Sequence, residues 1–213
     1  VLGANIYNNF NEFNNPSYSK LPHVRSDIQS YLKEGQTNIA RMKLDYIWTP
    51  FKDIYTRVDI GLLEEMFGGV GGEILYRPFN KRYAFGIVAH QVKQREFKQR
   101  FGFRDYETFT GHLEAYYELT NGINFALMAG KYLAGDKGAT FDVSRRFKSG
   151  FRVGIFATKT NVPKEIFGEG TFDKGFYFSI PTQMFLPNYE TGTIGFGMHP
   201  LTKDGGALLH NHN

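Results

Sequence analysis

A set of charged and hydrogen-bonding side chains could bind a polar ligand, because most of them alternate with apolar residues and so share one face of a predicted strand. Arginine binds the carboxylates of acidic sugars through two parallel hydrogen bonds, and arginine–carboxylate pairs offer fixed donors and acceptors to sugar hydroxyls. The set consists of Arg41, Lys43, Asp45, Arg57, Asp59, Glu73, Arg77, His112, Glu114, Tyr116, Asp142, Arg146 and Arg152. Most such charges neutralise one another inside a barrel, so the prediction concerns the collective polarity of this face and not a single residue.

Paired carboxylates are a second chemistry to consider, because glycosidases use two of them. Glu64 and Glu65 are adjacent, but successive residues on a strand face opposite sides, so they cannot flank one glycosidic bond. Two other pairs can share a face, namely Asp59 with Glu73 and Glu114 with Glu118. A serine hydrolase would need Ser144, His112 and Asp142 to meet, although Asp142 and Ser144 lie on the same predicted strand. We assign no catalytic residue.

The glycine-rich and histidine-containing stretches predict neither a cofactor nor a metal. The stretch "GGVGGE" (68–73) lacks the Lys-Ser/Thr of a phosphate-binding loop, so its glycines are expected at a bulge or a tight bend. The stretch "FGEGTFDKG" (167–175) lacks the ligand spacing of a calcium loop and is expected to be a structured loop. His210 and His212 are expected in a disordered tail.

The elements that must position these residues are predicted to be antiparallel strands. Apolar and polar residues alternate with a period of two, as in "FDVSRRFKSGFRVGIFATKT" (141–160). Short turn sequences separate the alternating segments, and Asn121-Gly122 is the clearest of them. Eleven strands are predicted, at 2–9, 38–49, 53–65, 70–78, 82–97, 105–119, 122–134, 138–148, 150–160, 173–185 and 191–200. No stretch alternates strands with long helices, so a parallel α/β fold is disfavoured.

One short helix is predicted within a long connection, residues 10–37. In "RSDIQSYLKEG", Ser26 is the expected N-cap, Gln29 its capping-box partner, and Gly35 the residue that ends the helix. Ile28, Tyr31 and Leu32 form an apolar stripe. This amphipathic helix could serve as a plug, a lid or a surface loop on the rim of a barrel, and the sequence does not choose among them.

Length and composition are those of one all-β domain covering residues 1–213. The chain has 213 residues, no cysteine and 16% aromatic residues, and it contains no run of about 18 apolar residues that would form a transmembrane helix. Without cysteine there are neither disulfides nor thiolate metal sites. The formal net charge is +4, with lysine and arginine scattered among 21 acidic residues, so a nucleic-acid partner is not predicted.

The alternating pattern fits two opposite folds equally well: a soluble barrel or sandwich with an apolar interior, and a transmembrane β-barrel with a polar one. Three features favour the membrane barrel. The predicted strands are long for a soluble sandwich, the polar face mixes both charges with glycine, and aromatic residues gather near the ends of apolar stripes, as at Tyr46 and Trp48, Tyr83 and Phe85, Phe141 and Phe147, and Phe176 and Phe178.

Several segments, in order along most of the chain, resemble the YjbH family of outer-membrane exopolysaccharide-biosynthesis proteins. They are "LPHVRSDIQSYLKEG" (21–35), "GLLEEMFGGVGGEILYRPF" (61–79), "VKQREFKQRFGFRDYETFTGHLEAYY" (92–117), "AGKYLAGDKGATFDVSRRF" (129–147), "FGEGTFDKGFYFSIP" (167–181) and "PLTKDGGALL" (200–209). The resemblance implies that the chain is the C-terminal portion of a longer protein. An odd count of eleven strands and an abrupt start in a strand fit a partial barrel, whereas the ending "LLHNHN" departs from the aromatic last residue usual in such barrels.

The expectation is therefore an antiparallel transmembrane β-barrel, or part of one, in the Gram-negative outer membrane. The resemblance implies a role in exopolysaccharide or capsule export, with polysaccharide, outer-membrane lipid and other exopolysaccharide-secretion proteins as partners, and no catalytic residues to transfer. Two alternatives stay open: an outer-membrane barrel enzyme that modifies polysaccharide or lipid, and a soluble β-barrel binding protein.

Overall fold

A single antiparallel sheet dominates the fold. The computed structural model describes residues 2–4, 20–163, 172–184, 192–198 and 204–210. Ten strands form one sheet in which each pairs with its neighbour in sequence: β3 (Met42–Phe51), β4 (Ile54–Leu62), β5 (Phe67–Tyr76), β6 (Tyr83–Arg95), β7 (Phe103–Glu118), β8 (Ile123–Lys131), β9 (Lys137–Arg146), β10 (Arg152–Thr160), β11 (Asp173–Pro181) and β12 (Thr193–Met198). The strands β1 (Leu2–Ala4) and β2 (Thr37–Ile39) form a separate two-stranded sheet.

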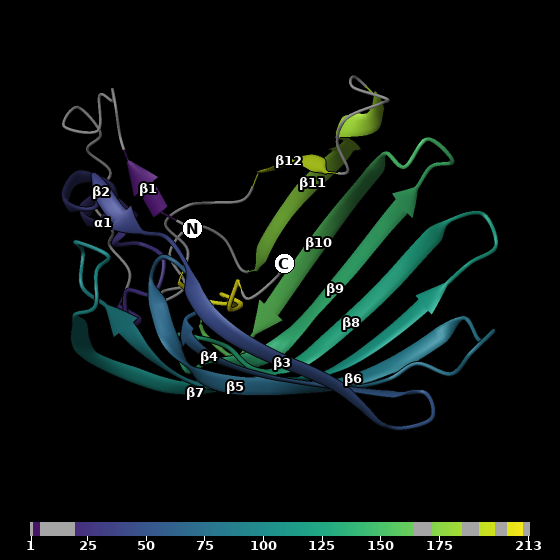
Figure 1. The fold of residues 1–213 in the computed structure, drawn as a ribbon, viewed down its shortest axis with the longest axis horizontal. Helices are drawn as coiled ribbons and strands as arrows, with labels where there is room; N and C mark the ends of the chain where they lie inside the picture. Colours follow the sequence, from purple (N-terminus) through teal and green to yellow (C-terminus); the bar gives the residue numbers. More distant parts are fainter. Residues whose placement is uncertain (1, 5–19, 164–171, 185–191, 199–203, 211–213) are drawn as a thin grey trace.

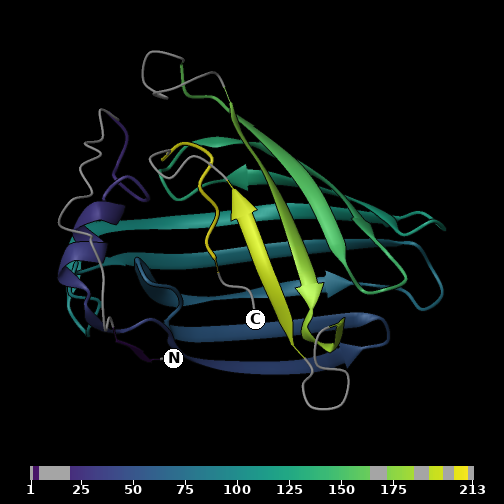
Figure 2. The same cartoon turned by 90° about the horizontal axis from the view of Figure 1, so that it is seen from above.

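The strands run between two different ends of the sheet (Figures 1 and 2). At the end that we call the hairpin end, short turns at 52–53, 77–82, 119–122 and 147–151 join consecutive strands. At the other, the helix end, lie α1 (Ile28–Glu34) and the connections 63–66, 96–102 and 132–136. The predicted Asn121-Gly122 turn is confirmed: Gly122 has φ +77°, a conformation that favours glycine, and its N–H donates to Leu119 O at 3.1 Å.

Within the described residues the strands lie where they were predicted, except at residues 182–184, which form a short 3-10 helix, and around residue 40, where the predicted strand 38–49 is wrong. Residues 5–9, 185, 191 and 199–200 of the predicted strands lie outside the described residues. The structure divides the predicted strand 38–49 into β2 and β3, which raises the strand count of the described residues from the predicted eleven to twelve. The side chain of Arg95 is the physical reason, because its guanidinium donates to the carbonyls of Ile39 at 2.8 Å and Ala40 at 3.4 Å. Both carbonyls thus accept hydrogen bonds from a side chain at the point where β2 ends and β3 has not yet begun.

The predicted helix is present, but its N-cap differs from the prediction. The N-cap residue is Asp27, without a side-chain cap hydrogen bond, whereas Ser26 donates its hydroxyl to Asp204 at 2.8 Å. Gly35 ends α1 as predicted, and its N–H donates to Tyr31 O at 2.9 Å. Tyr31 is buried and Ile28 packs beside it, so the apolar stripe faces the protein. No helix in the described part of the chain is long and apolar enough to span a bilayer.

The two faces of the sheet are reversed relative to a water-soluble domain. On the convex face, large apolar side chains are exposed, among them Leu44 at 72%, Leu113 at 63% and Ile60 at 55%. On the concave face, Asp59 is fully buried and the Arg57 side chain is 17% exposed. The predicted division of the strands into an apolar and a polar face is therefore confirmed, with the polar face inside.

The expected closed barrel is not present within the described residues. The sheet curves strongly, as Figure 1 shows, but β3 pairs only with β4 and β12 pairs only with β11, so the two edges do not meet. A barrel removes its edges only by pairing the first strand with the last. The structure supports an all-β, open antiparallel sheet with one short helix.

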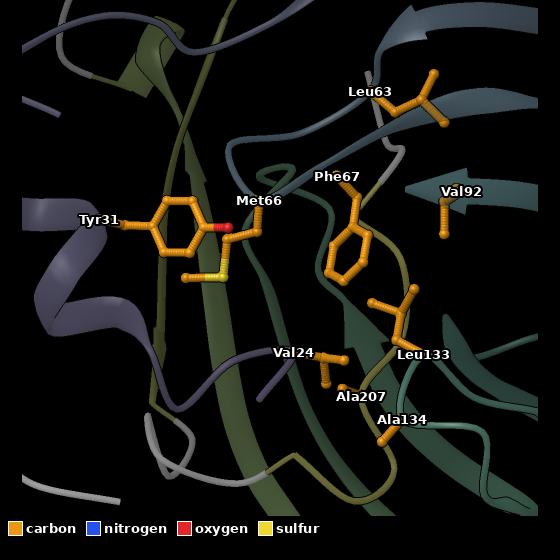
Figure 3. Packing of buried hydrophobic residues seen from close by; sticks show 9 residues of the cluster. All are labelled: Val24, Tyr31, Leu63, Met66, Phe67, Val92, Leu133, Ala134 and Ala207. Carbon is orange, nitrogen blue, oxygen red and sulfur yellow. The ribbon is translucent and has the colours of Figure 1, made fainter. Parts of the chain in front are cut away.

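The apolar core of the described residues lies at the helix end and not between two layers. It contains Val24, Tyr31, Leu63, Met66, Phe67, Val92, Leu133, Ala134 and Ala207 (Figure 3). These residues come from the segment before β2, from the connections at the helix end, from the adjoining ends of β5 and β6, and from residues 204–210. We call this group the end cluster. It packs the helix end while the concave face beyond it is polar.

Candidate functional site

The polar concave face has two parts with different charge balance. The first part, which we call the floor, crosses β3 to β6 and consists of Lys43, Asp45, Arg57, Asp59, Glu73 and His90. The second part is a cleft of about 990 Å³ at the hairpin end, bounded by residues of β5 to β12. The floor and the cleft lie on the same side of the sheet. Asp45, Asp59, Gly71 and His90 are cross-strand partners in one row of the floor, and Glu73 belongs to both the floor and the lining of the cleft.

The floor is neutralised by its own ion pairs. Arg57 contacts Glu73 at 3.1 Å and Asp59 at 3.7 Å, and His90 Nε2 lies 3.1 Å from Asp59 Oδ1. The neighbouring pair of Lys43 and Asp45 is 3.1 Å apart. Because positive and negative groups alternate within bonding distance, these side chains mainly satisfy each other.

A close backbone approach makes room for His90 in the floor. A Cβ atom on Gly71 would lie 2.2 Å from His90 Cδ2 and 2.4 Å from Ala89 O, which is closer than real Cβ contacts. Only glycine therefore allows the imidazole to cross the next strand and reach Asp59. His90 is 2% exposed, and it is a floor residue that was absent from the predicted set, because residues that share its face of β6, such as Ala84 and Val92, are apolar and give no sign of a polar face.

The middle of the concave face carries hydroxyl and imidazole groups. Tyr116 donates its hydroxyl to Glu114 Oε2 at 2.5 Å. The ring of His112 packs edge-on against Tyr132 with 4.7 Å between centroids, and Tyr132 joins a chain of hydroxyls through Thr140 and Thr158 with steps of 2.7 Å. His112, Tyr132, Thr140 and Thr158 are all buried, so these contacts hold the sheet together, whereas Tyr116 lines the cleft and can contact a ligand.

The cleft at the hairpin end is rich in cations. Its lining contains six basic side chains, Arg77, Lys81, Arg82, Arg146, Lys148 and Arg152, and three acidic ones, Glu73, Glu118 and Asp142. One of the acids, Glu73, is already paired with Arg57 of the floor. The ion pairs formed among the described residues involve none of the six cations. The cleft therefore carries a surplus of positive charge.

Arg152 is held in place on the wall of the cleft. Its Nε and Nη2 donate to Ser144 Oγ at 3.2 Å and 3.0 Å, and its guanidinium lies over the Tyr177 ring at 5.6 Å from the centroid. Tyr177 in turn donates its hydroxyl to Asp142 at 3.0 Å. The Tyr177 ring passes over Gly154, where a Cβ atom would lie 2.4 Å from the ring. The sequence thus builds a rigid support for one arginine.

An interlocking polar network closes the helix end. Arg25 contacts Glu64 at 2.5 Å and donates to Leu208 O at 2.7 Å, while His210 N–H donates to the other Glu64 oxygen at 2.7 Å. Burial raises the pKa of Glu64, but the charge and hydrogen bonds of Arg25 outweigh it, so the pKa lies below its ordinary value of 4.5. Asp204 accepts the backbone N–H groups of Arg25 and Ser26 at 2.8 and 3.0 Å.

A buried arginine ties the connections of the helix end together. Arg95 is fully buried and donates to Glu64 O at 2.8 Å, Gln99 O at 2.6 Å and Arg100 O at 3.1 Å, in addition to the carbonyls before β3. Tyr31 donates its hydroxyl to Arg95 O at 2.5 Å, and burial raises the pKa of Tyr31 to about 12, which keeps this donor protonated. No local sequence signal predicted this network, because its partners are far apart in the chain.

Comparisons with known proteins show the family of the chain. The family described as "Exopolysaccharide biosynthesis protein YbjH", named YjbH, matches residues 1–213. The chain belongs to the YjbH family. Over 211 residues it is 41% identical to a protein of Escherichia coli (strain K12) described as "Uncharacterized lipoprotein YjbH". The match covers 97% of this chain and 30% of that relative, and no solved structure matches.

Family membership confirms the resemblance found in the sequence, and the description of the family names exopolysaccharide biosynthesis. The chain spans about 30% of the length of its curated YjbH relative. Two of the segments that carried the resemblance, 21–35 and 200–209, meet in the structure, because Asp204 binds the backbone before α1. Residues of both segments contribute to the end cluster.

The structure divides the predicted sugar-contacting residues of this YjbH-family chain into groups. Lys43, Asp45, Arg57, Asp59 and Glu73 lie in the floor, Glu114 and Tyr116 bond to each other, and His112 faces Tyr132. The cleft brings together Glu73, Arg77, Tyr116, Asp142, Arg146 and Arg152. Arg41 lies outside both, in the break between β2 and β3. Lys81, Arg82 and Lys148 were not predicted to belong to the site, because they lie in turns where no alternation assigns a face.

The alternative catalytic groups have other partners. Ser144 accepts hydrogen bonds from Arg152, Asp142 accepts one from Tyr177, and His112 packs on Tyr132, so each member of the considered hydrolase set is engaged elsewhere. Among the described residues, no cluster of three or more His, Cys, Asp or Glu side chains could hold a metal ion.

Proposed function

We propose that this chain forms part of the wall of an outer-membrane β-barrel that exports or assembles an exopolysaccharide, without catalysing a reaction on it. The observation that carries the proposal is the reversal of the two faces of the sheet. Leu44, Ile60 and Leu113 are exposed on the convex face, whereas Asp59 and His90 are buried on the concave face. A soluble barrel would have the opposite arrangement, and a barrel in lipid requires this one.

The convex apolar surface has the extent expected of a membrane-facing band. Along β7 the outward residues are apolar or glycine from Phe109 to Tyr117, a length of roughly 27 Å at ~3.4 Å per residue. Tilting such a strand by about 35–45° gives a height of roughly 20 Å, comparable with the apolar band of about 25 Å in outer-membrane barrels. Outside this stretch, Asp105 and Glu107 are exposed on the same face.

Aromatic residues at one border of this band support the same proposal. On the convex face near the hairpin end, Tyr83 contacts Phe85 and Tyr117 is exposed, and on β3 the rings of Tyr46 and Trp48 lie 5.2 Å apart. Tyrosine and tryptophan prefer the membrane–water interface, where the ring is in an apolar region and the polar group reaches water.

The concave face supplies the chemistry for a hydrated polymer, because sugar hydroxyls exchange water for fixed donors and acceptors. The neutral floor and the cationic cleft would line the path, and the end cluster with α1 would restrict it at the helix end. Barrel closure then requires strands beyond the ten of this sheet or a pairing of β3 with β12. We place the chain in the C-terminal portion of a longer YjbH-family protein, which its coverage of only 30% of the relative permits.

The envelope location follows from two arguments. The relative from Escherichia coli is described as a lipoprotein, and lipoproteins are anchored in membranes by their acyl chains. The convex face of this chain offers a second and larger apolar contact. We therefore propose the Gram-negative outer membrane as its location, and other exopolysaccharide-secretion proteins, polysaccharide and outer-membrane lipid as its partners.

The experiment is extraction and gel mobility of the purified protein. We expect it to require detergent and to migrate differently before and after heating in a denaturing gel, as folded barrels do. A protein that stays monodisperse in buffer without detergent would overturn the membrane proposal. To separate export from catalysis, Glu114→Gln, which removes a carboxylate that forms no ion pair with the described residues, should reduce exopolysaccharide secretion only in part, whereas complete loss of secretion by a protein that still folds would indicate the alternative barrel enzyme.

A further inference from the structure

We propose that the cleft at the hairpin end binds anionic sugar units, so that the polymer handled by this chain is an acidic polysaccharide bearing carboxylate or phosphate groups. This inference rests on the proposed function for the statement that the ligand is a glycan. The sign of the ligand charge has an independent basis in the side chains that line the cleft.

The first argument is charge balance. The cleft has six basic side chains and three acidic ones in its lining, and Glu73 is already committed to Arg57. The floor of the same sheet shows the contrast, since Arg57 has two carboxylate partners there. In the cleft, Asp142 lies near enough to Arg152 for an electrostatic interaction but forms no ion pair with it, and the basic side chains still outnumber the acidic ones. An anionic ligand would supply the absent negative charge.

The second argument is a pair of arginines placed directly opposite each other. In the register of β9 and β10, Arg146 is the cross-strand partner of Arg152. Like charges in this position repel and destabilise a sheet by a few tenths to about 1 kcal/mol. The next strand places Ser179 beside Arg152, so the neighbouring position adds no acid. A bound carboxylate or phosphate between the two guanidinium groups would convert the repulsion into attraction.

The third argument is that Arg152 is oriented before a ligand arrives. Two hydrogen bonds to Ser144 and the ring of Tyr177 fix its guanidinium, and these bonds use two of its five N–H donors. The other donors can form the paired bonds that a carboxylate accepts. Fixing the side chain in advance reduces the entropy lost on binding.

The position of the cleft favours a glycan over a lipid headgroup. Asp142 and Arg152 lie on the concave face, whereas a bilayer would contact the convex face, where Leu113 and Ile155 are exposed. The volume of about 990 Å³ is at the upper end of the range of about 300–1,000 Å³ found for small-ligand pockets, so the cleft can hold a segment of polymer.

The test measures binding of short sugar chains to the full protein in nanodiscs of neutral phosphatidylcholine, by isothermal titration calorimetry. We expect oligogalacturonate to bind and a neutral maltodextrin of equal length to bind at least tenfold more weakly. Raising sodium chloride from about 50 mM to about 500 mM should weaken the oligogalacturonate affinity further, because the charges are partly exposed to solvent.

Matched variants locate the site. Arg152→Gln and Arg146→Gln should each weaken oligogalacturonate binding by about 3- to 10-fold, which corresponds to the loss of one partly exposed charge contact. Arg145→Gln is the control, because it removes the same charge from the adjacent residue of β9, whose guanidinium lies over Phe147 on the other face. The control should leave the affinity unchanged.

The outcomes separate this inference from the proposed function. Equal affinity for the neutral and acidic chains, or equal loss with all three variants, would overturn the acidic-glycan assignment even if the protein behaves as a membrane barrel. Competition by phosphatidylglycerol added to the nanodiscs would show a headgroup site and would also overturn it. Conversely, selective oligogalacturonate binding by a protein that needs no detergent would uphold the charge assignment and contradict the membrane proposal.

Discussion

Replacing Leu113 with lysine tests the membrane-facing assignment of the convex surface directly. Leu113 is 63% exposed and lies midway between Phe109 and Tyr117, the two ends of the apolar stretch of β7. In water, exchanging such an exposed leucine for lysine would change stability by no more than about 0.5 kcal/mol. In a bilayer, the same exchange places a charge near the middle of the hydrocarbon region.

The expected cost follows from the depth of the residue. Leu113 is roughly 13 Å along the strand from either border of the band, or about 10 Å from each interface after strand tilt. A lysine at the bilayer midplane of a barrel costs about 2–4 kcal/mol, falling to about 0–1 kcal/mol near an interface. We therefore expect Leu113→Lys to lower the free energy of unfolding by about 3 kcal/mol.

The assay is equilibrium unfolding by denaturant in lipid vesicles. Trp48 is the single tryptophan of the chain and lies on β3 beside Tyr46, so its fluorescence reports the folded sheet. The control is Gln91→Lys, which adds the same charge on the exposed face of β6 opposite Phe109, at the border of the band. Its expected cost is about 0–1 kcal/mol.

Two results would refute the reasoning. If Leu113→Lys and Gln91→Lys cost the same amount within about 0.5 kcal/mol, depth in a bilayer does not determine the cost. If Leu113→Lys raised the solubility of the protein in buffer without loss of folded structure, the convex face would be a surface that another protein covers and not one that contacts lipid.

Two substitutions and one pH dependence test the helix end and the floor of the sheet. Glu64→Gln should lower the free energy of unfolding by about 3 kcal/mol, because it leaves the buried Arg25 charge without its partner, whereas the exposed neighbour Glu65→Gln should change it by less than about 0.5 kcal/mol. The pKa of Glu64 is lower in the folded protein, so the contribution of its carboxylate to the free energy of unfolding should be complete above pH 4.5 and be lost as the pH falls below that value. The unfolding curves of Glu64→Gln should lack this loss at acidic pH. Gly71→Ala should lower the free energy of unfolding by about 1–3 kcal/mol and displace the side chain of His90. The NMR chemical shifts of the His90 imidazole would report this displacement, and unchanged shifts would contradict the close approach of Gly71 to His90.

The sequence was sufficient to predict the strands and their faces because both depend on local spacing. A period of two assigns each side chain to a face without knowledge of its partners, so Leu44 and Asp45 were placed on opposite sides correctly. The same pattern cannot tell which face is inside, since it is symmetric with respect to lipid and water. Strand length and aromatic position favoured a polar interior, and in the structure the polar residues Asp59 and His90 are buried on the concave face.

The contacts that close the helix end could not be predicted from the sequence, and the reason is physical. Glu64 meets Arg25 and His210, partners separated from it by long stretches of chain, and the free energy of such contacts depends on the final fold. The assignment of Ser26 as an N-cap failed for the same reason, because the distant carboxylate of Asp204 binds its hydroxyl. Arg95 interrupts the predicted strand at residue 40 in a similar way.

The floor and the cleft are both polar, but they differ in the balance of positive and negative charge. This difference separates residues with a structural role from residues that can bind a ligand. In the floor, Arg57 already has carboxylates at 3.1 and 3.7 Å, so a ligand would have to displace them and would gain little. In the cleft, Arg146 and Arg152 face each other across two strands, and a ligand carboxylate would remove a repulsion while forming hydrogen bonds. A polymer passing along the concave face would therefore be held at the cleft and slide over the neutral floor, which predicts that charge substitutions in the cleft alter affinity and those in the floor alter folding.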